Sequence, residues 1–326
     1  MKNFKYRLLS LFIGLVFAVA IWQTAETHIA DFWGKTLFHI FGNSFMEVST
    51  MDKNGIPMRY YPSAKKVYDP ELIAAQSSRF YKTRIEEPRK TAFLLYSKWL
   101  EEHLDENGNI SNDFDYPKAG IKKPWFSSTA NSATMVALAQ RAGHLRDPEP
   151  FIKARKMLYN LQPDNGSFSF YEKTGGIWFQ EFPTEPYSLS GMLKTLINLS
   201  EYHKMVDDSL SQKLFQQGVI ALQAKLPELA KHNWLDDKYH YKNKRSEHLE
   251  LTQLLAEVNS ATADSVFTPY IYNYQAKNRQ FVLFQLISRP QPGRILGFLF
   301  AWAVFYLIAY LFLKPKKSAM GEASNS

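Results

Sequence analysis

Residues 186–204 read PYSLSGMLKTLINLSEYHK, and residues 208–226 read DSLSQKLFQQGVIALQAKL. The apolar side chains of the first stretch recur at i, i+3, i+4, i+7 and i+8: Leu189, Met192, Leu193, Leu196 and Ile197. This period predicts a helix that buries one face. A proline is well tolerated in the first turn, and the short link of residues 205–207 predicts that the two helices run antiparallel.

Helix pairs of this kind occur twice earlier in the chain. Asp69 and Pro70 form a helix start, because the aspartate caps the helix and the proline fits its first turn. The predicted pairs are residues 69–81 with 88–104 and residues 127–142 with 148–161, and a seventh helix covers residues 246–258. Long loops join the pairs. We therefore predict a mainly α fold, an incomplete (α/α)6-type barrel or α/α-toroid of helix hairpins, whose loops meet over a central cleft. An irregular helical bundle is the alternative.

Three segments with alternating apolar residues predict β-hairpins added to the helices. The first covers residues 45–61 around a turn at 52–55, and the second covers residues 166–182 around a turn at 174–176. The third is rich in aromatic residues and covers residues 266–287.

Both ends of the chain are apolar. Residues 295–313 are 19 consecutive uncharged residues, close to the length of a helix that spans a bilayer, and we expect a transmembrane helix there. Residues 8–22 follow three basic residues and predict a signal anchor, or a signal peptide cleaved near Ala18-Val19-Ala20. Basic residues flank both segments on the side that would face the cytoplasm, so residues 23–294 are expected outside the cytoplasm, on the periplasmic or lumenal side.

These patterns divide the chain into six expected segments: a signal anchor or signal peptide (1–22), a membrane-proximal segment and β-hairpin (23–61), an α/α-barrel domain (62–262), an aromatic β-hairpin (263–294), a transmembrane helix (295–313) and a cytoplasmic tail (314–326).

Charge and composition narrow the classes of partner. The 326 residues include 39 Lys and Arg against 31 Asp and Glu, a net charge of +8. Six of these basic residues and Glu322 lie in the cytoplasmic flanks, which leaves 33 basic against 30 acidic residues elsewhere, a net +3. We therefore expect a lipid bilayer as a partner and no nucleic acid. The chain has no cysteine, no P-loop and no histidines at ligand spacing, so no cofactor and no metal site is predicted.

Five short motifs follow one another in the chain: NGIP (54–57) with VYDPELIA (67–74), KPWFSS (123–128), GGIWFQEFPT (175–184) and LSGML (189–193). In order and spacing they resemble the D-glucuronyl C5-epimerase family, over about residues 52–258. The resemblance implies an extracytoplasmic α/α-barrel that inverts C5 of uronic acid residues within a polysaccharide. It also implies a uronate-containing polysaccharide as substrate and other membrane proteins of polysaccharide assembly as partners.

Inversion at C5 removes a proton α to a carboxylate, so the site needs a base, a second proton donor and cations that hold the carboxylate. Glu181 lies between the predicted hairpin and a helix, and is either a general base, a substrate-orienting acid or a solvated loop acid. The resemblance implies Tyr239 as a catalytic phenol, Lys242 as a substrate-binding cation and His248 as a further catalytic residue. The alternatives are an exposed polar loop at residues 239–242 and a helix-face histidine at His248. Tyr187 is a second candidate phenol. Trp125 and Trp178 are either platforms for a sugar ring or core residues.

The chain departs from the family at two tyrosine positions. Phe182 stands where a tyrosine usually follows the glutamate, and the family's Tyr-His pair is absent near residues 244–245. A phenyl ring transfers no proton. Two alternatives to an epimerase are therefore a noncatalytic glycan-binding or scaffold subunit of an envelope polysaccharide system, and a polysaccharide lyase or hydrolase on the same scaffold.

Overall fold

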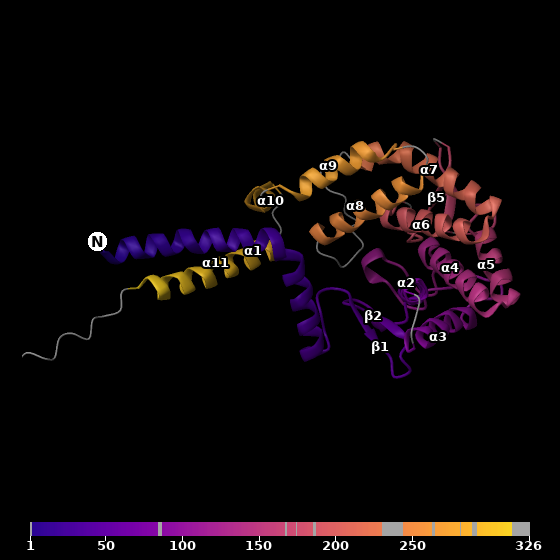
Figure 1. The fold of residues 1–326 in the computed structure, drawn as a ribbon, viewed down its shortest axis with the longest axis horizontal. Coiled ribbons are helices and arrows are strands. Elements are labelled where there is room, and N and C mark those ends of the chain that lie inside the picture. The colour runs from indigo at the N-terminus through magenta and orange to yellow at the C-terminus, as the bar shows by residue number, and fades with distance from the viewer. Residues whose placement is uncertain are drawn as a thin grey trace, which may run out of the picture. The chain divides into compact units, whose positions relative to one another are not determined.

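The computed structural model describes residues 2–83, 87–166, 168–173, 175–184, 187–229, 244–262, 265–280, 282–288 and 292–314 (Figure 1). They form two compact units, residues 31–278 and residues 1–30 with 279–326. The helices and strands are α1 (Lys2–Phe41), β1 (Val48–Met51), β2 (Pro57–Tyr61), β3 (Lys65–Val67), α2 (Pro70–Lys82), α3 (Arg89–Glu102), the 3₁₀ turn η1 (Pro117–Ala119), α4 (Ser128–Leu145), α5 (Pro148–Asn160), β4 (Ser169–Tyr171), β5 (Ile177–Phe179), α6 (Leu189–Val206), α7 (Ser209–Leu229), α8 (Lys244–Ala261), α9 (Thr268–Asn278), α10 (Val282–Ser288) and α11 (Pro292–Leu313).

The larger unit is an arc of helix hairpins (Figure 1). Helices α2, α4, α6 and α8 pack against one another in sequence, and α3, α5, α7 and α9 each pack against the preceding inner helix. Along α4 and α6 their shared core includes the fully buried Leu138, Leu193 and Leu196, together with buried polar side chains such as Asn131 and Thr195. This confirms the mainly α fold class, an incomplete α/α-toroid of helix hairpins.

Two small sheets lie beside the helices, as predicted. Strands β1, β2 and β3 form an antiparallel sheet in that order, with Val48 opposite Tyr60 and Arg59 opposite Val67. Strands β4 and β5 form the second hairpin, in which Phe170 lies opposite Trp178. Its Gly176 has a φ of +86° and lies so close to α7 that a Cβ would approach the Gln217 carbonyl to 2.3 Å. The glycine therefore allows the hairpin to rest on α7.

The prediction of a third hairpin at residues 266–287 is wrong. The structure has helices α9 and α10 there, and α9 pairs with α8. The buried side chains around α9 are Phe267, Ile271 and Tyr274, which recur at i, i+4 and i+7, whereas Tyr272 is 70% exposed. Of the alternating tyrosines, Tyr272 is exposed and Tyr274 is buried, so the alternation does not mark one buried face, and the helical period of the buried residues determines the structure.

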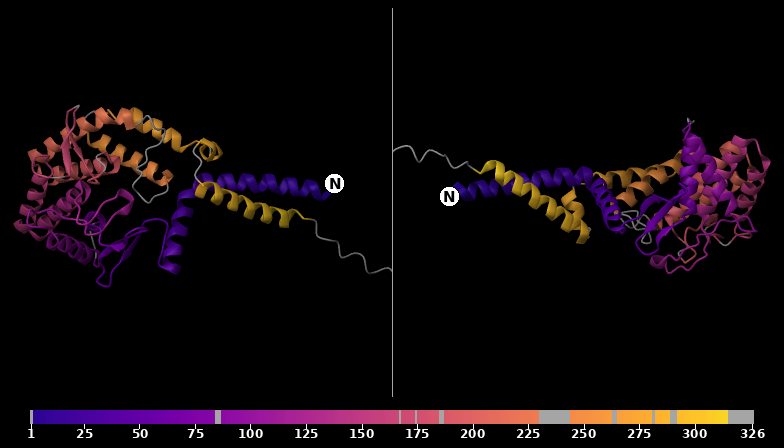
Figure 2. Two further views of the ribbon diagram at one scale, coloured as in Figure 1. Left: turned by 180° about the vertical axis from the view of Figure 1, so that it is seen from behind. Right: turned by 90° about the horizontal axis from the view of Figure 1, so that it is seen from below.

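The smaller unit contains two helices that are long and apolar enough to cross a membrane, at Phe4–Ile29 and Gly293–Leu313. They pack side by side (Figure 2). The rings of Phe17 and Phe305 stack at 6.0 Å, and a Cβ on Gly14 would lie 2.6 Å from the backbone nitrogen of Tyr306. Small residues permit such close approach between membrane helices.

A buried ion pair joins the same two helices. Arg294 Nη2 lies 2.7 Å from Glu26 Oε2, Arg294 Nε pairs with the other carboxylate oxygen, and both side chains are at most 5% exposed. A bidentate pair of this kind fixes the relative register of the two helices, because neither charge has water as an alternative partner.

We predict that paired cysteines at Phe17 and Phe305 will be joined by a short bismaleimide in the full-length chain in native membranes. The chain has no cysteine of its own, so these would be its only thiols. The matched control pairs Phe17→Cys with Phe312→Cys, since Phe312 is 86% exposed. A cross-linked product with the control pair alone, or an N-terminus found beyond residue 20, would contradict the helix pairing.

Candidate functional site

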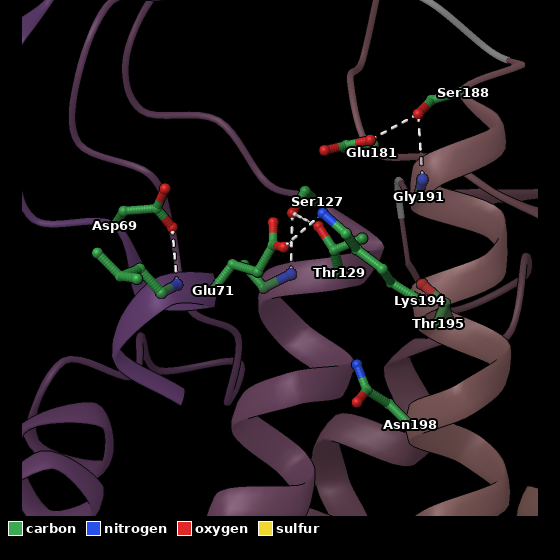
Figure 3. Close-up of polar contacts among 12 residues, drawn as sticks. Asp69, Glu71, Ser127, Thr129, Glu181, Ser188, Gly191, Lys194, Thr195 and Asn198 are labelled. Atoms are coloured by element: carbon green, nitrogen blue, oxygen red, sulfur yellow. Dashed lines mark hydrogen bonds and ion pairs between the residues drawn. The ribbon is translucent and has the colours of Figure 1, made fainter. Parts of the chain in front are cut away.

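Three inner helices begin at one place in the larger unit (Figure 3). Each has a side-chain cap: Asp69 Oδ1 accepts from Leu72 N at the start of α2, Ser127 Oγ from Ala130 N at α4, and Ser188 Oγ from Gly191 N at α6. These caps satisfy backbone donors that the first turn leaves unpaired. Because helix N-termini carry partial positive charge, their meeting point favours carboxylates.

Glu181 is held at this meeting point by local structure. Its side chain is buried at 5% exposure, and Ser188 Oγ donates to its Oε2 at 2.6 Å. The backbone is fixed as well, because Ser128 N donates to the Gln180 carbonyl at 2.8 Å. Gly191 completes the arrangement, since a Cβ there would lie 2.5 Å from Glu181 Cβ. Of the three interpretations of Glu181, the solvated loop acid is therefore the one that its burial does not fit.

Glu181 lines a cavity of about 20 Å³, room for about one water molecule. The cavity walls are rich in ionisable groups: Glu47, Arg59, Tyr61, Asp69, Glu71 and Glu181. The rings of Trp125 and Phe182, which belong to a buried aromatic cluster, form another part of its wall.

Strand β2 supplies one charged network of this cavity. Arg59 and Tyr61 lie two residues apart and so on the same face of the strand. Arg59 Nε pairs with Asp69 Oδ2 at 3.1 Å, and the Tyr61 hydroxyl donates to the same oxygen at 2.7 Å. Burial raises the pKa of Tyr61 well above its usual value, although the charge of Arg59 opposes this shift. Tyr61 is thus a neutral phenol.

Helices α2 and α6 supply the second network. Lys194 Nζ pairs with Glu71 Oε1 at 2.7 Å, and each side chain is less than 20% exposed. Burial alone would raise the pKa of Glu71, but the charges of Lys194 and Arg59 hold it below its usual value. Burial alone would lower the pKa of Lys194, but the charges of Glu71, Glu181 and Glu250 raise it well above its usual value. Both groups are therefore charged at neutral pH.

A larger cavity of about 430 Å³ lies along the inner faces of α2, α4, α6 and α8. Its volume falls in the range of small-molecule sites. Lys194, Arg79 and Lys82 bring positive charge to its walls, and Glu71, Glu201 and Glu257 bring as many carboxylates. Lys82 Nζ pairs with Glu201 at 2.8 Å. Glu71 and Thr129 line both cavities, so the ion pair of Glu71 and Lys194 lies at the boundary between them.

The remaining residues predicted for the site are placed as follows. Trp125 lines the small cavity and donates from Nε1 to the Phe114 carbonyl, whereas Trp178 is fully buried in the helical core. Tyr187 packs on Trp178 and donates its hydroxyl to Glu172, a hydrogen bond that raises the pKa of Tyr187 to about 12. His248 is fully buried, with Nε2 3.3 Å from the Tyr274 carbonyl oxygen. Tyr239 and Lys242 lie outside the described residues.

The structure thus brings Glu181 and Trp125 to one cavity, and it places the Tyr187 hydroxyl and His248 in other contacts. The catalytic roles of these residues stay predictions. Sequence reasoning missed Arg59, Tyr61, Glu71 and Lys194. One signal was available for Lys194, which follows the LSGML motif directly.

Phe182, the residue in place of the family's tyrosine, is buried in an aromatic cluster. Its ring stacks on Tyr116 with centroids 5.4 Å apart and an interplanar angle of 14°, and it packs on Trp125 at 5.8 Å. The ring therefore covers the small cavity and offers it no polar atom.

Comparison with known proteins supports one family. The family described as D-glucuronyl C5-epimerase C-terminus matches residues 104–276, about half of the chain. The chain belongs to this family. A D-glucuronyl C5-epimerase of Caenorhabditis elegans is 26% identical over 165 residues, which cover 44% of this chain and 27% of that protein. Among solved structures, a GH76 alpha-mannanase of Bacteroides thetaiotaomicron aligns with a TM-score of 0.41 at 10% identity, over 83% of this chain and 72% of that one.

We predict that Gly191→Ala will destabilise the full-length chain in detergent micelles by about 1–3 kcal/mol, because the added Cβ overpacks against Glu181. Gly143→Ala in α4 is the matched control, since a Cβ there meets nothing within 4 Å. That control should be neutral or stabilising, because alanine favours a helix over glycine. Denaturant unfolding followed by circular dichroism measures both; equal effects would contradict the close approach of Glu181 to α6.

We predict that Lys194→Met will destabilise the chain at pH 7 by about 3 kcal/mol, because Glu71 loses its nearest cation. Since folding lowers the pKa of Glu71, the pair stabilises the fold above the usual carboxyl pKa and loses this effect as pH falls through the lowered value. Since folding raises the pKa of Lys194, the effect persists up to the usual amine pKa and is lost as pH rises through the raised value.

The double variant Glu71→Gln with Lys194→Met is the control for this prediction. It should recover most of the stability at pH 7, because no unpaired buried charge remains. Unfolding measured at pH 7 and at pH 4 tests the predicted direction of the pH dependence. The free energy of unfolding of the wild type should fall more on acidification than that of the double variant. Equal stability of the wild type and Lys194→Met at pH 7 would contradict the ion pair.

Proposed function

We propose that this protein is a membrane-anchored uronate C5-epimerase that acts on uronic acid residues of a polysaccharide. Its family membership supports the class of reaction. The observation that carries the proposal is the gathering of buried Glu181 and protonated Lys194 at the N-terminal ends of the inner helices, with Lys194 in the wall of a cavity of sugar size.

The chemistry requires a cation at the substrate carboxylate. Removing the C5 proton places negative charge on the adjacent carboxylate as the aci-carboxylate forms, and a fixed positive charge lowers the energy of that species. Lys194 is the described cation that best fits this role, because it faces the larger cavity and stays protonated beside Glu71. Lys242 is proposed as a second cation on the strength of the family resemblance.

The proton moves between two faces of the sugar ring. In the proposed reaction Glu181 takes the C5 proton, and a phenol on the opposite face returns one proton to the same carbon. The substrate and product are therefore isomers, with no oxidant or leaving group. Tyr239 is proposed as the phenol, and Tyr187 and His248 stay secondary candidates. Trp125 and Trp178 stay candidate sugar platforms, although the full burial of Trp178 is typical of a core residue.

One observation favours a second function, a noncatalytic glycan-binding subunit. Phe182 fills the position of a family tyrosine and covers a cavity too small for a sugar ring. A site of this kind would bind the uronate through Lys194 in the larger cavity and leave its C5 proton in place.

We further propose that α1 and α11 anchor the protein in a bilayer with residues 31–278 outside the cytoplasm. The two apolar helices and the basic residues that flank them at both chain ends support this orientation. A uronate polysaccharide made or exported at the membrane would then reach the cavity directly.

We predict that the full-length chain will incorporate deuterium at C5 when incubated with uronate polysaccharides in heavy water, with chain length unchanged. Glu181→Gln should lower the exchange rate by about 100-fold or more, because a positioned general base contributes about 10²–10⁴-fold. Mass spectrometry of hydrolysed uronates measures the label. Binding without exchange would favour the noncatalytic function, exchange with new unsaturated chain ends would indicate a lyase, and full exchange by Glu181→Gln would refute this base assignment.

A further inference from the structure

The last turns of α1, residues 31–41, belong to the larger unit and are docked on its three-stranded sheet (Figure 1). Phe38 is buried, and the centre of its ring lies 5.0 Å from that of Tyr60 on β2. One turn earlier, a Cβ on Gly34 would lie 3.1 Å from the Met46 sulfur. One face of this helical segment is therefore covered by the protein's own fold.

The other side of the segment is apolar and exposed. Phe32, Trp33 and Ile40 are each more than half exposed, and their positions i, i+1 and i+8 place them on one side of the helix. Phe41 at the end of α1 and Phe45 just beyond it are also more than half exposed. A helix on the surface of a globular protein usually presents polar residues on its outer side, so this exposed apolar face is typical of an interaction surface.

The course of the chain indicates which partner is near. The apolar span Phe4–Ile29 lies in the same helix and ends three residues before Phe32. Because a helix rises about 1.5 Å per residue, the exposed apolar face begins about 5 Å from the end of that span along the chain. If the span crosses a bilayer, this length reaches the layer of lipid headgroups, where aromatic side chains are enriched.

Exposed lysines border the exposed apolar face. Lys35 lies on α1 itself, and Lys65 and Lys66 lie on β3, all three exposed. The Lys66 ammonium is 5.4 Å from the centre of the Phe38 ring, so β3 brings its positive charge beside the helix. Within residues 31–47 the exposed acid is Asp31. This combination of aromatic and basic side chains is typical of helices that lie in the interface of an anionic membrane.

The strand beneath this segment also forms the candidate site. Tyr60 faces Phe38, whereas its neighbours Arg59 and Tyr61 line the small cavity. Successive side chains of a strand point to opposite sides, so β2 alone separates the docked helix from that cavity. A lipid contact on the helix would therefore place the candidate site close to the membrane surface.

We propose that the exposed apolar face of residues 32–45, together with Lys35, Lys65 and Lys66, binds the surface of an anionic phospholipid bilayer. The proposal rests on the proposed anchoring by α1 and α11, because the anchor brings this face to a membrane. It adds a second attachment that lies in the headgroup layer and spans nothing. The aromatic side chains enter that layer, and the lysines pair with lipid phosphates.

The test uses the full-length chain in vesicles of phosphatidylcholine and phosphatidylglycerol, with a fluorescent label on a single cysteine. The chain has no cysteine of its own, so each label has a defined position. Ile40→Cys probes the exposed apolar face. Ile152→Cys on α5 is the matched control because both isoleucines are 65% exposed, and Ile308→Cys reports on the proposed membrane span. Lipids with brominated acyl chains should quench the labels at residues 40 and 308 and leave the label at residue 152 unchanged.

A charge variant tests the preference for anionic lipid. In the Ile40→Cys chain, added salt should reduce the quenching, because it screens the attraction between lysines and lipid phosphates. Lys65→Gln with Lys66→Gln should shift the ratio of lipid-bound to free surface about 30-fold, the change expected for two lysines at an anionic membrane, and should weaken the salt dependence. Lys204→Gln with Lys213→Gln removes two exposed lysines elsewhere and should behave like the parent chain. Circular dichroism verifies that each variant is folded.

Three results would overturn the proposal. Quenching at residue 308 without quenching at residue 40 would refute the lipid-binding face, leave the anchoring in place and indicate a protein partner instead. Quenching at neither position would refute the anchoring and the lipid-binding face with it. Unchanged quenching and salt dependence in the Lys65 and Lys66 variant would refute the recognition of anionic lipid.

Discussion

The ion pair of Glu71 and Lys194 is the interaction on which the candidate site depends. Several carboxylates lie where α2, α4 and α6 begin, and partial helix charges offset only part of their mutual repulsion. Lys194 from α6 supplies a full positive charge within 2.7 Å of Glu71, and Arg59 from β2 supplies another within 3.1 Å of Asp69. Each cation comes from a different element than the acid it pairs with. The charges thus hold together helices that are distant in sequence.

This arrangement also explains how one site can serve an anionic sugar. A substrate carboxylate bound at Lys194 would share this cation with Glu71, so that the buried glutamate keeps its partner. Glu71 lies at the boundary of the sugar-sized cavity, where a substrate carboxylate would approach Lys194. The neutral phenol of Tyr61 and the capping serines surround the same point, and they supply hydrogen-bond donors without adding charge.

The sequence predicts the helices well, because apolar side chains at a helical period report burial directly. Asp69 and Ser127 were predicted at helix starts and Glu181 was recognised from its motif, whereas the cap Ser188 was not predicted, because that helix was expected to begin at Pro186. The partnership of Glu71 with Lys194 was not predictable, because the two residues are 123 positions apart and a charged residue on a helix is usually solvated. Residues 266–287 misled because their aromatic residues alternate in the sequence, whereas the side chains buried around α9 follow a helical period.

The most direct test of this account is a crystal structure of the protein with a bound glucuronate oligosaccharide. The account predicts a uronate carboxylate within hydrogen-bond distance of Lys194 Nζ, with the C5 hydrogen of that sugar directed at Glu181. A uronate bound on the outer helices α3, α5 or α7, with the pair of Glu71 and Lys194 untouched by ligand, would contradict it.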